Sequence, residues 1–126
     1  MTETFDNLIK DAKEVSRNAY APYSKLNAGA ALLCRDGSVY TGVNVENVSF
    51  PAGTCAERSA LSAAVSDGKR KFTAIAIYSE KQITPCGFCR QTLIEFGDMW
   101  VITASADGEI KQYTLSKLLP EAFLKF

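Results

Sequence analysis

Residues 55–78, CAERSALSAAVSDGKRKFTAIAIY, predict a helix followed by a buried strand. The first part, 55–65, is rich in alanine and serine, and Asp67-Gly68 is a typical place for a helix to end at a glycine. The small side chains of such a helix suit close packing on a sheet. The second part, 72–78, is a continuous apolar run of strand length, as expected of a strand that is covered on both faces. The segment therefore predicts a layered α/β arrangement.

The rest of the chain continues this alternation of helices and strands. Further helices are predicted over 5–20, 87–96 and 116–119, and further strands over 28–33, 39–43 and 99–104. Pro22 and Gly97 are expected to end the helices before them, and Asp36-Gly37 is a hairpin signal between two strands. The length of 126 residues suits one core rather than two. We therefore expect a single α/β domain over residues 1–126.

The overall charge and hydropathy exclude several classes of partner. Fourteen Lys and Arg residues balance fourteen Asp and Glu residues, so the basic excess of a protein that binds a polynucleotide is lacking. The first fifteen residues are charged throughout and do not resemble a signal peptide, and no run approaches the roughly 20 apolar residues of a membrane span. We expect no nucleic-acid polymer and no membrane as partner, and a cytoplasmic location.

The sequence contains four cysteines and no histidine. In a cytosolic chain, cysteines more often bind metals or act as catalytic thiols than form disulfides. The absence of histidine removes the commonest acid–base group and the commonest nitrogen ligand of a metal. Any proton transfer therefore falls to a carboxylate, a lysine, a tyrosine or a cysteine.

Three of the cysteines lie in two short segments, 54–58 (TCAER) and 85–91 (PCGFCRQ). The spacing of Cys86 and Cys89 lets both sulfurs reach one ion at about 2.3 Å. Cys55 supplies a third ligand if the two predicted helices begin side by side. Three protein ligands leave the fourth tetrahedral position for water, which is typical of a catalytic zinc site. We therefore expect one zinc ion per chain.

Glu57 and Arg58 follow the first ligand closely. Both ligand segments lie at predicted helix starts, where the positive end of the helix dipole stabilises thiolates. Three thiolates on Zn²⁺ still leave a net charge of −1, which Arg58 is placed to offset. Glu57 lies two residues after Cys55, near the metal without binding it, and is the best candidate to carry protons in a chain without histidine.

These motifs together resemble the small cytidine deaminases that hold zinc with three cysteines. The signature of zinc deaminases is H-x-E followed by P-C-x-x-C, with a histidine or a cysteine as the first ligand, and here the first element is Cys55-Ala56-Glu57. The other matching segments are 21–24 (APYS), 29–33 (GAALL), 42–47 (GVNVEN) and 118–120 (LLP), so the resemblance covers nearly the whole chain. It implies a three-layer α/β/α fold with a central mixed sheet of about five strands.

The resemblance also implies a substrate and an assembly. Asn44 and Glu46 are expected to hydrogen-bond the ribose hydroxyls, and the backbone of Ala56 to hold the pyrimidine carbonyl. The expected reaction is the deamination of cytidine and deoxycytidine to uridine and deoxyuridine, with release of ammonia in pyrimidine salvage. Members of the family form homotetramers that share active sites, and Phe50 and Phe123 match aromatic positions that cross between subunits.

Other expected site residues include departures from the family pattern. Arg58 and Gln91 are expected beside the metal ligands. Leu26 is expected against the base, where the family usually has Phe. Phe50 stands where Tyr is usual, and Phe88 stands where Ala is common. These departures concern the pocket for the base more than the metal or the proton transfer.

Several alternative interpretations remain open. Taken alone, Cys86 and Cys89 fit a redox pair or a structural metal clip as well as a catalytic site. A non-enzymatic zinc module would need a fourth ligand, such as Cys34 or a carboxylate. Cys34 itself is expected to be a buried apolar residue without a role.

Some single residues also fit plainer roles. Glu57 fits a carboxylate at a helix start, and Asn44 and Glu46 fit a turn. Leu26, Phe50 and Phe123 fit core or interface positions. Alternative substrates of a zinc deaminase are blasticidin S, guanine, RNA or DNA. The expected sugar-binding pair argues against the first two, and the neutral charge argues against the polynucleotides.

Overall fold

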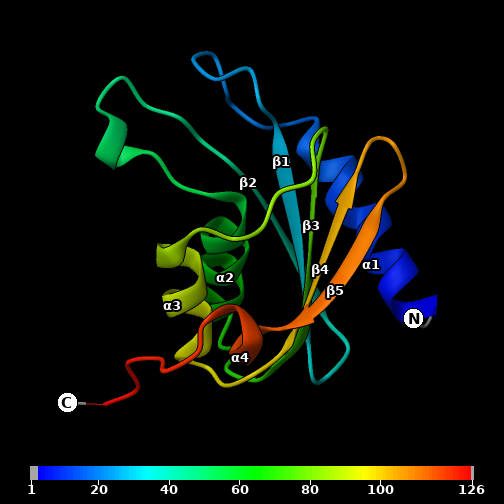
Figure 1. The fold of residues 1–126 in the computed structure, drawn as a ribbon, viewed down its shortest axis with the longest axis vertical. Helices are drawn as coiled ribbons and strands as arrows, with labels where there is room; N and C mark the ends of the chain where they lie inside the picture. Colours follow the sequence, from blue (N-terminus) through cyan, green and yellow to red (C-terminus); the bar gives the residue numbers. More distant parts are fainter. Residues whose placement is uncertain (1–2, 126) are drawn as a thin grey trace.

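The computed structural model describes residues 3–125 and contains one five-stranded sheet with helices on both faces (Figure 1). The strands are β1 (Ala28–Cys34), β2 (Val39–Val43), β3 (Phe72–Ser79), β4 (Trp100–Ser105) and β5 (Ile110–Thr114). The helices are α1 (Glu3–Ser16), α2 (Ala56–Ser66), α3 (Gly87–Ile94) and α4 (Leu115–Leu118), with a 3₁₀ turn over Phe50–Ala52. No helix among these residues is long and apolar enough to cross a membrane.

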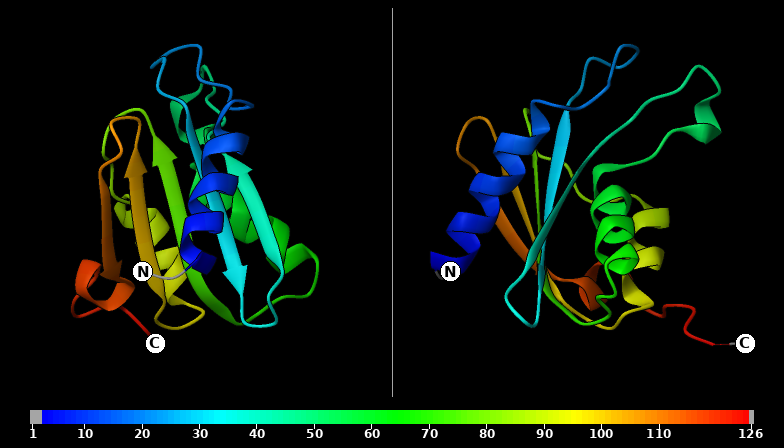
Figure 2. Two further views of the ribbon diagram at one scale, coloured as in Figure 1. Left: turned by 90° about the vertical axis from the view of Figure 1, so that its right-hand side faces the viewer. Right: turned by 180° about the vertical axis from the view of Figure 1, so that it is seen from behind.

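The sheet has the strand order β2-β1-β3-β4-β5 and is mixed. Strand β1 is antiparallel to β2 and to β3, β3 is parallel to β4, and β4 is antiparallel to β5. Helix α1 lies on one face, and α2 and α3 lie on the other (Figures 1 and 2). The expected three-layer α/β/α arrangement with a mixed sheet of five strands is therefore confirmed.

Each face of the sheet has its own apolar cluster. The larger cluster lies between the sheet and the helices α2 and α3. Its fully buried side chains include Leu32, Ile75, Ile77, Leu93 and Val101. Between the sheet and α1 lie Leu8, Ala12, Ala31, Ala76 and Ile102. Strands β1 and β3 contribute to both clusters, which explains why their sequences are apolar without alternation.

Gly42 brings α2 close to strand β2. A Cβ atom at this position would lie 2.3 Å from the backbone nitrogen of Ala60 and 2.7 Å from the carbonyl oxygen of Ala56. The hydroxyl of Ser59 also donates a hydrogen bond of 2.9 Å to the carbonyl of Val43. The start of α2 is therefore held against the sheet by backbone contact rather than by long side chains.

Element boundaries differ from the predicted ones in a few places. The first helix ends at Ser16, whose hydroxyl donates to the carbonyl of Lys13, and does not extend to residue 20. Tyr20 instead pairs with the chain beside Val45. Strand β5 has no counterpart among the predicted strands because its sequence, IKQYT, is mostly exposed and shows no apolar run. The other predicted elements are present within two residues of their expected bounds.

Candidate metal centre

The three cysteines of the two motifs lie together at the starts of two neighbouring helices. Cys55 is the N-cap of α2, Cys86 is the N-cap of α3, and Cys89 lies in the first turn of α3. The Sγ atoms of Cys55 and Cys86 are 3.9 Å apart, and those of Cys86 and Cys89 are 3.5 Å apart. Cys89 is fully buried, Cys55 is half-buried and Cys86 is exposed. The cluster therefore has one side in the core and one side open to solvent.

This cluster fits a zinc ion. Tetrahedral ligation at the usual Zn–S distance of about 2.3 Å places ligand sulfurs about 3.8 Å apart, close to the two observed separations. All three sulfurs lie within 4.8 Å of one another. Within residues 3–125, no fourth cysteine or carboxylate joins the group, and Cys34 is not part of it. Three ligands leave one position for water, as in catalytic zinc sites.

The charges of the thiols also favour a cation at this place. Hydrogen bonds, first from the Cys89 thiol and then from Arg58 and Cys86, lower the pKa of the Cys55 thiol to about 5. The same contact with Cys55, together with burial, raises the pKa of the Cys89 thiol. Without a cation, one sulfur can carry a negative charge only while its neighbour keeps a proton. A divalent ion removes this conflict because all three ligands can then ionise.

Glu57 lies beside the cluster without belonging to it. Its side chain is only 5% exposed and comes from the first turn of α2. Burial, the largest cause, raises the pKa of its carboxyl group, and the charge on the neighbouring Cys55 adds to the rise. A carboxylate whose pKa is raised accepts a proton more readily than an ordinary carboxylate does, and it can then pass the proton on.

The side chain of Arg58 contacts the cluster at Cys55. Its Nη2 atom is 3.7 Å from the Sγ atom of Cys55, and this contact raises the pKa of the guanidinium. The guanidinium also lies over the exposed ring of Phe88, 5.8 Å from the ring centroid. Its Nε atom is buried and has no hydrogen-bond partner among the described residues. The arginine is thus placed to offset the charge of the thiolates.

Asn44 and Glu46 lie on the segment that leads towards the cluster. Val45, between them, exchanges two backbone hydrogen bonds with Thr54, the residue before Cys55. The amide of Asn44 accepts a hydrogen bond from the N–H of Ala28 and donates one to the carbonyl of Leu26. The chain therefore holds this polar pair next to the first metal ligand.

The Glu46 carboxylate has several partners on the loop before β1. Its Oε1 atom accepts bonds from the backbone N–H groups of Tyr23 and Ser24, and its Oε2 atom accepts the hydroxyl of Ser24. These bonds lower the pKa of the carboxyl, the Ser24 hydroxyl most of all. Glu46 is thus ionised and held in place within the single chain.

The remaining predicted site residues come from several segments of the chain. Ala56 is the first residue of α2, where a backbone N–H has no partner inside the helix. Leu26 is half-buried on the loop before β1. Phe50 is 91% exposed and Phe123 is 61% exposed. The side chain of Gln91 donates a hydrogen bond of 2.8 Å to the carbonyl of Phe123.

Sequence reasoning assigned no role to Arg90, which organises the second metal-binding segment. Its guanidinium donates to the carbonyls of Pro85 and Leu118, at 2.6 Å each, and to the hydroxyl of Thr84. The arginine thereby fastens the turn before Cys86 to the end of α4. The one feature of the sequence that could have indicated this role is the position of Arg90 directly after Cys89, the second cysteine of C-x-x-C.

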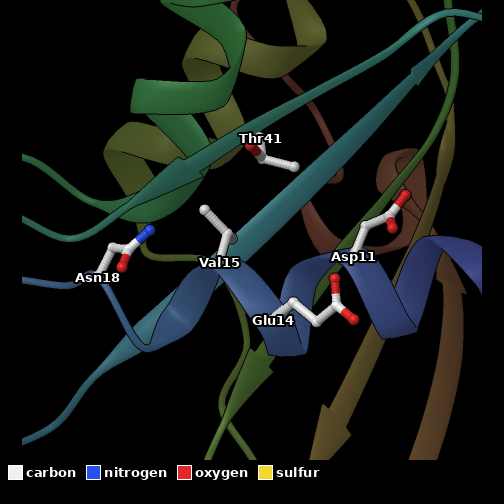
Figure 3. A pocket seen from close by; sticks show the side chains of 5 residues that line it. All are labelled: Asp11, Glu14, Val15, Asn18 and Thr41. Carbon is white, nitrogen blue, oxygen red and sulfur yellow. The ribbon is translucent and has the colours of Figure 1, made fainter.

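Two surface hollows lie away from the cysteine cluster. One, of about 280 Å³, lies between α1 and β2 and is lined by Asp11, Glu14, Val15, Asn18 and Thr41 (Figure 3). The other, of about 370 Å³, lies at the turn between β1 and β2 and includes the pair Asp36 and Lys69. Neither is lined by a residue that the sequence predicted for the site.

Comparisons with known proteins agree with this geometry. Residues 2–105 match the family described as the cytidine and deoxycytidylate deaminase zinc-binding region. The chain is 45% identical over 124 residues to a cytidine deaminase of Sporosarcina psychrophila, covering 95% of this chain and 91% of that protein. It is 45% identical over 120 residues to a cytidine deaminase of Halalkalibacterium halodurans, covering 92% and 91% of the two chains.

A solved structure and a more distant relative complete the comparison. The crystal structure of cytidine deaminase from Burkholderia pseudomallei matches with a TM-score of 0.92 and 43% identity, covering 98% of this chain and 100% of that chain. A blasticidin-S deaminase of Bacillus cereus is 27% identical over 107 residues, covering 77% of this chain and 76% of that protein. Similarity is therefore stronger to the cytidine deaminases than to this relative with another substrate.

Proposed function

The chain belongs to the cytidine and deoxycytidylate deaminase family, and on this premise we propose that it deaminates cytidine and deoxycytidine by hydrolysis. The products are uridine and deoxyuridine, with release of ammonia, a reaction of pyrimidine salvage. The observation that carries the proposal is the three-sulfur cluster with a buried glutamate beside it. Cys55, Cys86 and Cys89 hold one zinc ion per chain in this proposal.

Glu57 carries the protons of the reaction. When bound, the zinc ion supplies a site that lowers the pKa of a water molecule. The carboxylate of Glu57 takes a proton from the attacking water and delivers it to N3 of the cytosine ring as C4 becomes tetrahedral. It then moves a second proton to the amino group on C4, which leaves as ammonia. Its burial keeps bulk water from competing for these protons.

The residues around the cluster orient the substrate. We propose that Asn44 and Glu46 bind the sugar hydroxyls and that the N–H of Ala56, at the start of α2, binds the carbonyl of the pyrimidine ring. The amide of Asn44 uses one donor and one acceptor within the chain, which leaves one of each for a ligand. Leu26 lies on the loop next to this pair and supplies an apolar surface for the base.

We further propose a homotetramer whose subunits complete one another's sites. Phe50 and Phe123 are large apolar side chains that are mostly exposed in the single chain, and contact with another subunit would remove this surface from water. Gln91 fixes the carbonyl of Phe123 from the same helix that carries Cys89. This bond ties the backbone of Phe123 to α3. Light scattering of the purified protein tests the number of subunits.

A cytoplasmic location fits the same site. The four cysteines are free thiols in the structure, and thiol ligands for zinc persist in a reducing compartment.

The decisive experiment replaces Glu57 with Gln and measures zinc content and ammonia release from cytidine. We expect one zinc ion per chain to remain and turnover to fall by about 10²–10⁴-fold, the usual contribution of a general acid–base group. Glu95→Gln, the same chemical change at the exposed far end of α3, is the control and should keep full activity. Full activity of the Glu57 variant with zinc retained would contradict the mechanism. Fast turnover of blasticidin S instead of cytidine would contradict the substrate.

A further inference from the structure

The loop of residues 20–27 is fastened to the segment of residues 44–46 by polar bonds rather than by apolar packing. At the base of the loop, the N–H of Tyr20 donates to the carbonyl of Asn44, and the N–H of Glu46 donates to the carbonyl of Tyr20. At the end of the loop, the Asn44 side chain donates a hydrogen bond to the carbonyl of Leu26 and accepts one from the N–H of Ala28. Figure 1 shows this loop and the 44–54 segment extending beyond the same end of the sheet. The two segments that meet the sugar and the base are therefore one bonded unit.

Ser24 lies at the centre of this unit. Its hydroxyl donates to Oε2 of Glu46 and also accepts a bond of 3.1 Å from the N–H of Leu26. Its own N–H, with that of Tyr23, donates to Oε1 of the same carboxylate. One side chain thus connects the proposed sugar ligand with the residue expected against the base.

The conformation of the loop needs such a connection. Lys25, between Ser24 and Leu26, has a φ of 62°, in the left-handed region that residues other than glycine rarely adopt. Residues 22–25 are exposed, so no apolar burial favours this conformation. Backbone strain of this kind persists where surrounding bonds over-determine it. The bonds around Lys25 are that of its own N–H to the carbonyl of Ala21, at 3.0 Å, and those of Ser24 and Glu46 on either side of it.

We propose that Ser24 is a positioning residue, which orients the Glu46 carboxylate for the sugar and fixes the Leu26 backbone before substrate arrives. The proposal rests on the proposed function, because it takes Glu46 as a sugar ligand. Removal of the hydroxyl frees Oε2 of Glu46 and leaves the N–H of Leu26 without its acceptor. The metal ligands and Glu57 do not contact the loop through any of these bonds, so the proton transfer itself is unaffected.

The test compares Ser24→Ala, Ser24→Thr and Ser38→Ala with the unaltered enzyme. Ser38 is a matched control because its hydroxyl also donates to a carboxylate, Asp36, in an exposed turn remote from the site. For Ser24→Ala we expect KM for cytidine to rise about fivefold to tenfold, the size expected for the loss of one hydrogen bond of ordinary strength, with kcat within about twofold. Ser24→Thr keeps the hydroxyl and should restore KM, and Ser38→Ala should leave KM unchanged.

Two further measurements separate positioning from a general structural effect. With 2′,3′-dideoxycytidine, which lacks the 2′- and 3′-hydroxyls of the sugar, Ser24→Ala should raise KM much less than with cytidine. In hydrogen exchange, the amide of Leu26 should exchange at least about tenfold faster in Ser24→Ala only, because its acceptor is lost.

Three results would overturn the proposal. They are an unchanged KM in Ser24→Ala, an equal rise in KM for both nucleosides, and an unchanged exchange rate at Leu26. Failure of the unaltered enzyme to deaminate cytidine would instead overturn the proposed function. In that case the exchange measurement still decides whether Ser24 holds the loop.

Discussion

The cysteine cluster and the two loops proposed to bind the sugar are held in place by different forces. The cluster stands on helix starts that pack on the sheet through buried side chains, and Cys89 itself is fully buried. The loop of residues 20–27 is mostly exposed and is held by hydrogen bonds to Asn44 and Glu46. Apolar packing thus positions the cysteine cluster, and polar bonds position the loop that is proposed to bind the substrate. A substitution in the cluster should therefore leave the conformation of the loop unchanged, and a substitution in the loop should leave zinc binding unchanged.

The largest expected effect comes from removing a buried metal ligand. Cys89→Ala should lower zinc from one ion per chain to almost none and reduce ammonia release to that of a zinc-free sample, because two thiolates form an incomplete site. Metal analysis and an ammonia assay measure both. Cys34→Ala is the matched control, since Cys34 is also buried but lies outside the cluster. It should cost about 1 kcal/mol of unfolding free energy and keep the metal. Zinc retention by Cys89→Ala would refute the assignment.

The next effect tests whether backbone packing positions the cluster. In Gly42→Ala the new Cβ meets the backbone of α2 at 2.3 Å, so we expect the unfolding free energy to fall by about 3 kcal/mol and zinc binding to weaken. Denaturant unfolding with metal analysis measures this. Gly37→Ala is the control because Gly37 has a φ of +94° and open space around it. It should cost about 1 kcal/mol through backbone strain alone and leave zinc binding intact. Equal effects on zinc would show that α2 is not held by this contact.

A smaller effect is expected in the loop region. Leu26→Phe places an aromatic ring where the base is expected, so KM for cytidine should fall about threefold by stacking. The unfolding free energy should change by less than about 0.5 kcal/mol because Leu26 is only half-buried. Steady-state kinetics and denaturant unfolding measure the two. Leu26→Ala should have the opposite effect and raise KM for cytidine. A large loss of stability in either variant would place Leu26 in the core rather than in the substrate pocket.

The smallest effect concerns a polar contact without a catalytic role, at the turn between β1 and β2. Hydrogen bonds from Lys69, and then from Ser38, hold the pKa of Asp36 well below its ordinary value. A lowered pKa in the folded state means that ionised Asp36 stabilises the fold above about pH 4, and that this contribution is lost as the pH falls below that value.

Asp36→Asn should therefore lower the melting temperature slightly at pH 7, and the difference should shrink as the pH falls below about 4. Added salt should also reduce it, because Asp36 is exposed. Thermal unfolding at several pH values measures this. A difference that grows at low pH would contradict the sign of the pKa shift.

Much of the fold could be predicted because it depends on short stretches of sequence. The apolar run 72–78 and the small residues of 55–65 predict β3 and α2 without knowledge of distant contacts. The end of α1 could not be predicted in this way. Ala19 and Tyr20 continue the apolar spacing, but Tyr20 bonds to residues 44 and 46, more than twenty positions away. Strand β5 was missed for a related reason, since an exposed edge strand needs no apolar pattern.

The sequence by itself determined the chemical groups of the site. Metal ligands require specific atoms at short spacing, and C-x-x-C with C-x-E supplies three sulfurs and one carboxylate within two local motifs. Only the tertiary structure decided how the polar residues outside these motifs are used. Arg90 braces the turn before Cys86, Gln91 holds the carbonyl of Phe123, and Ser24 joins Glu46 to Leu26. The physical reason is that such side chains have many possible partners in sequence, and the fold selects the one that lies within hydrogen-bond distance.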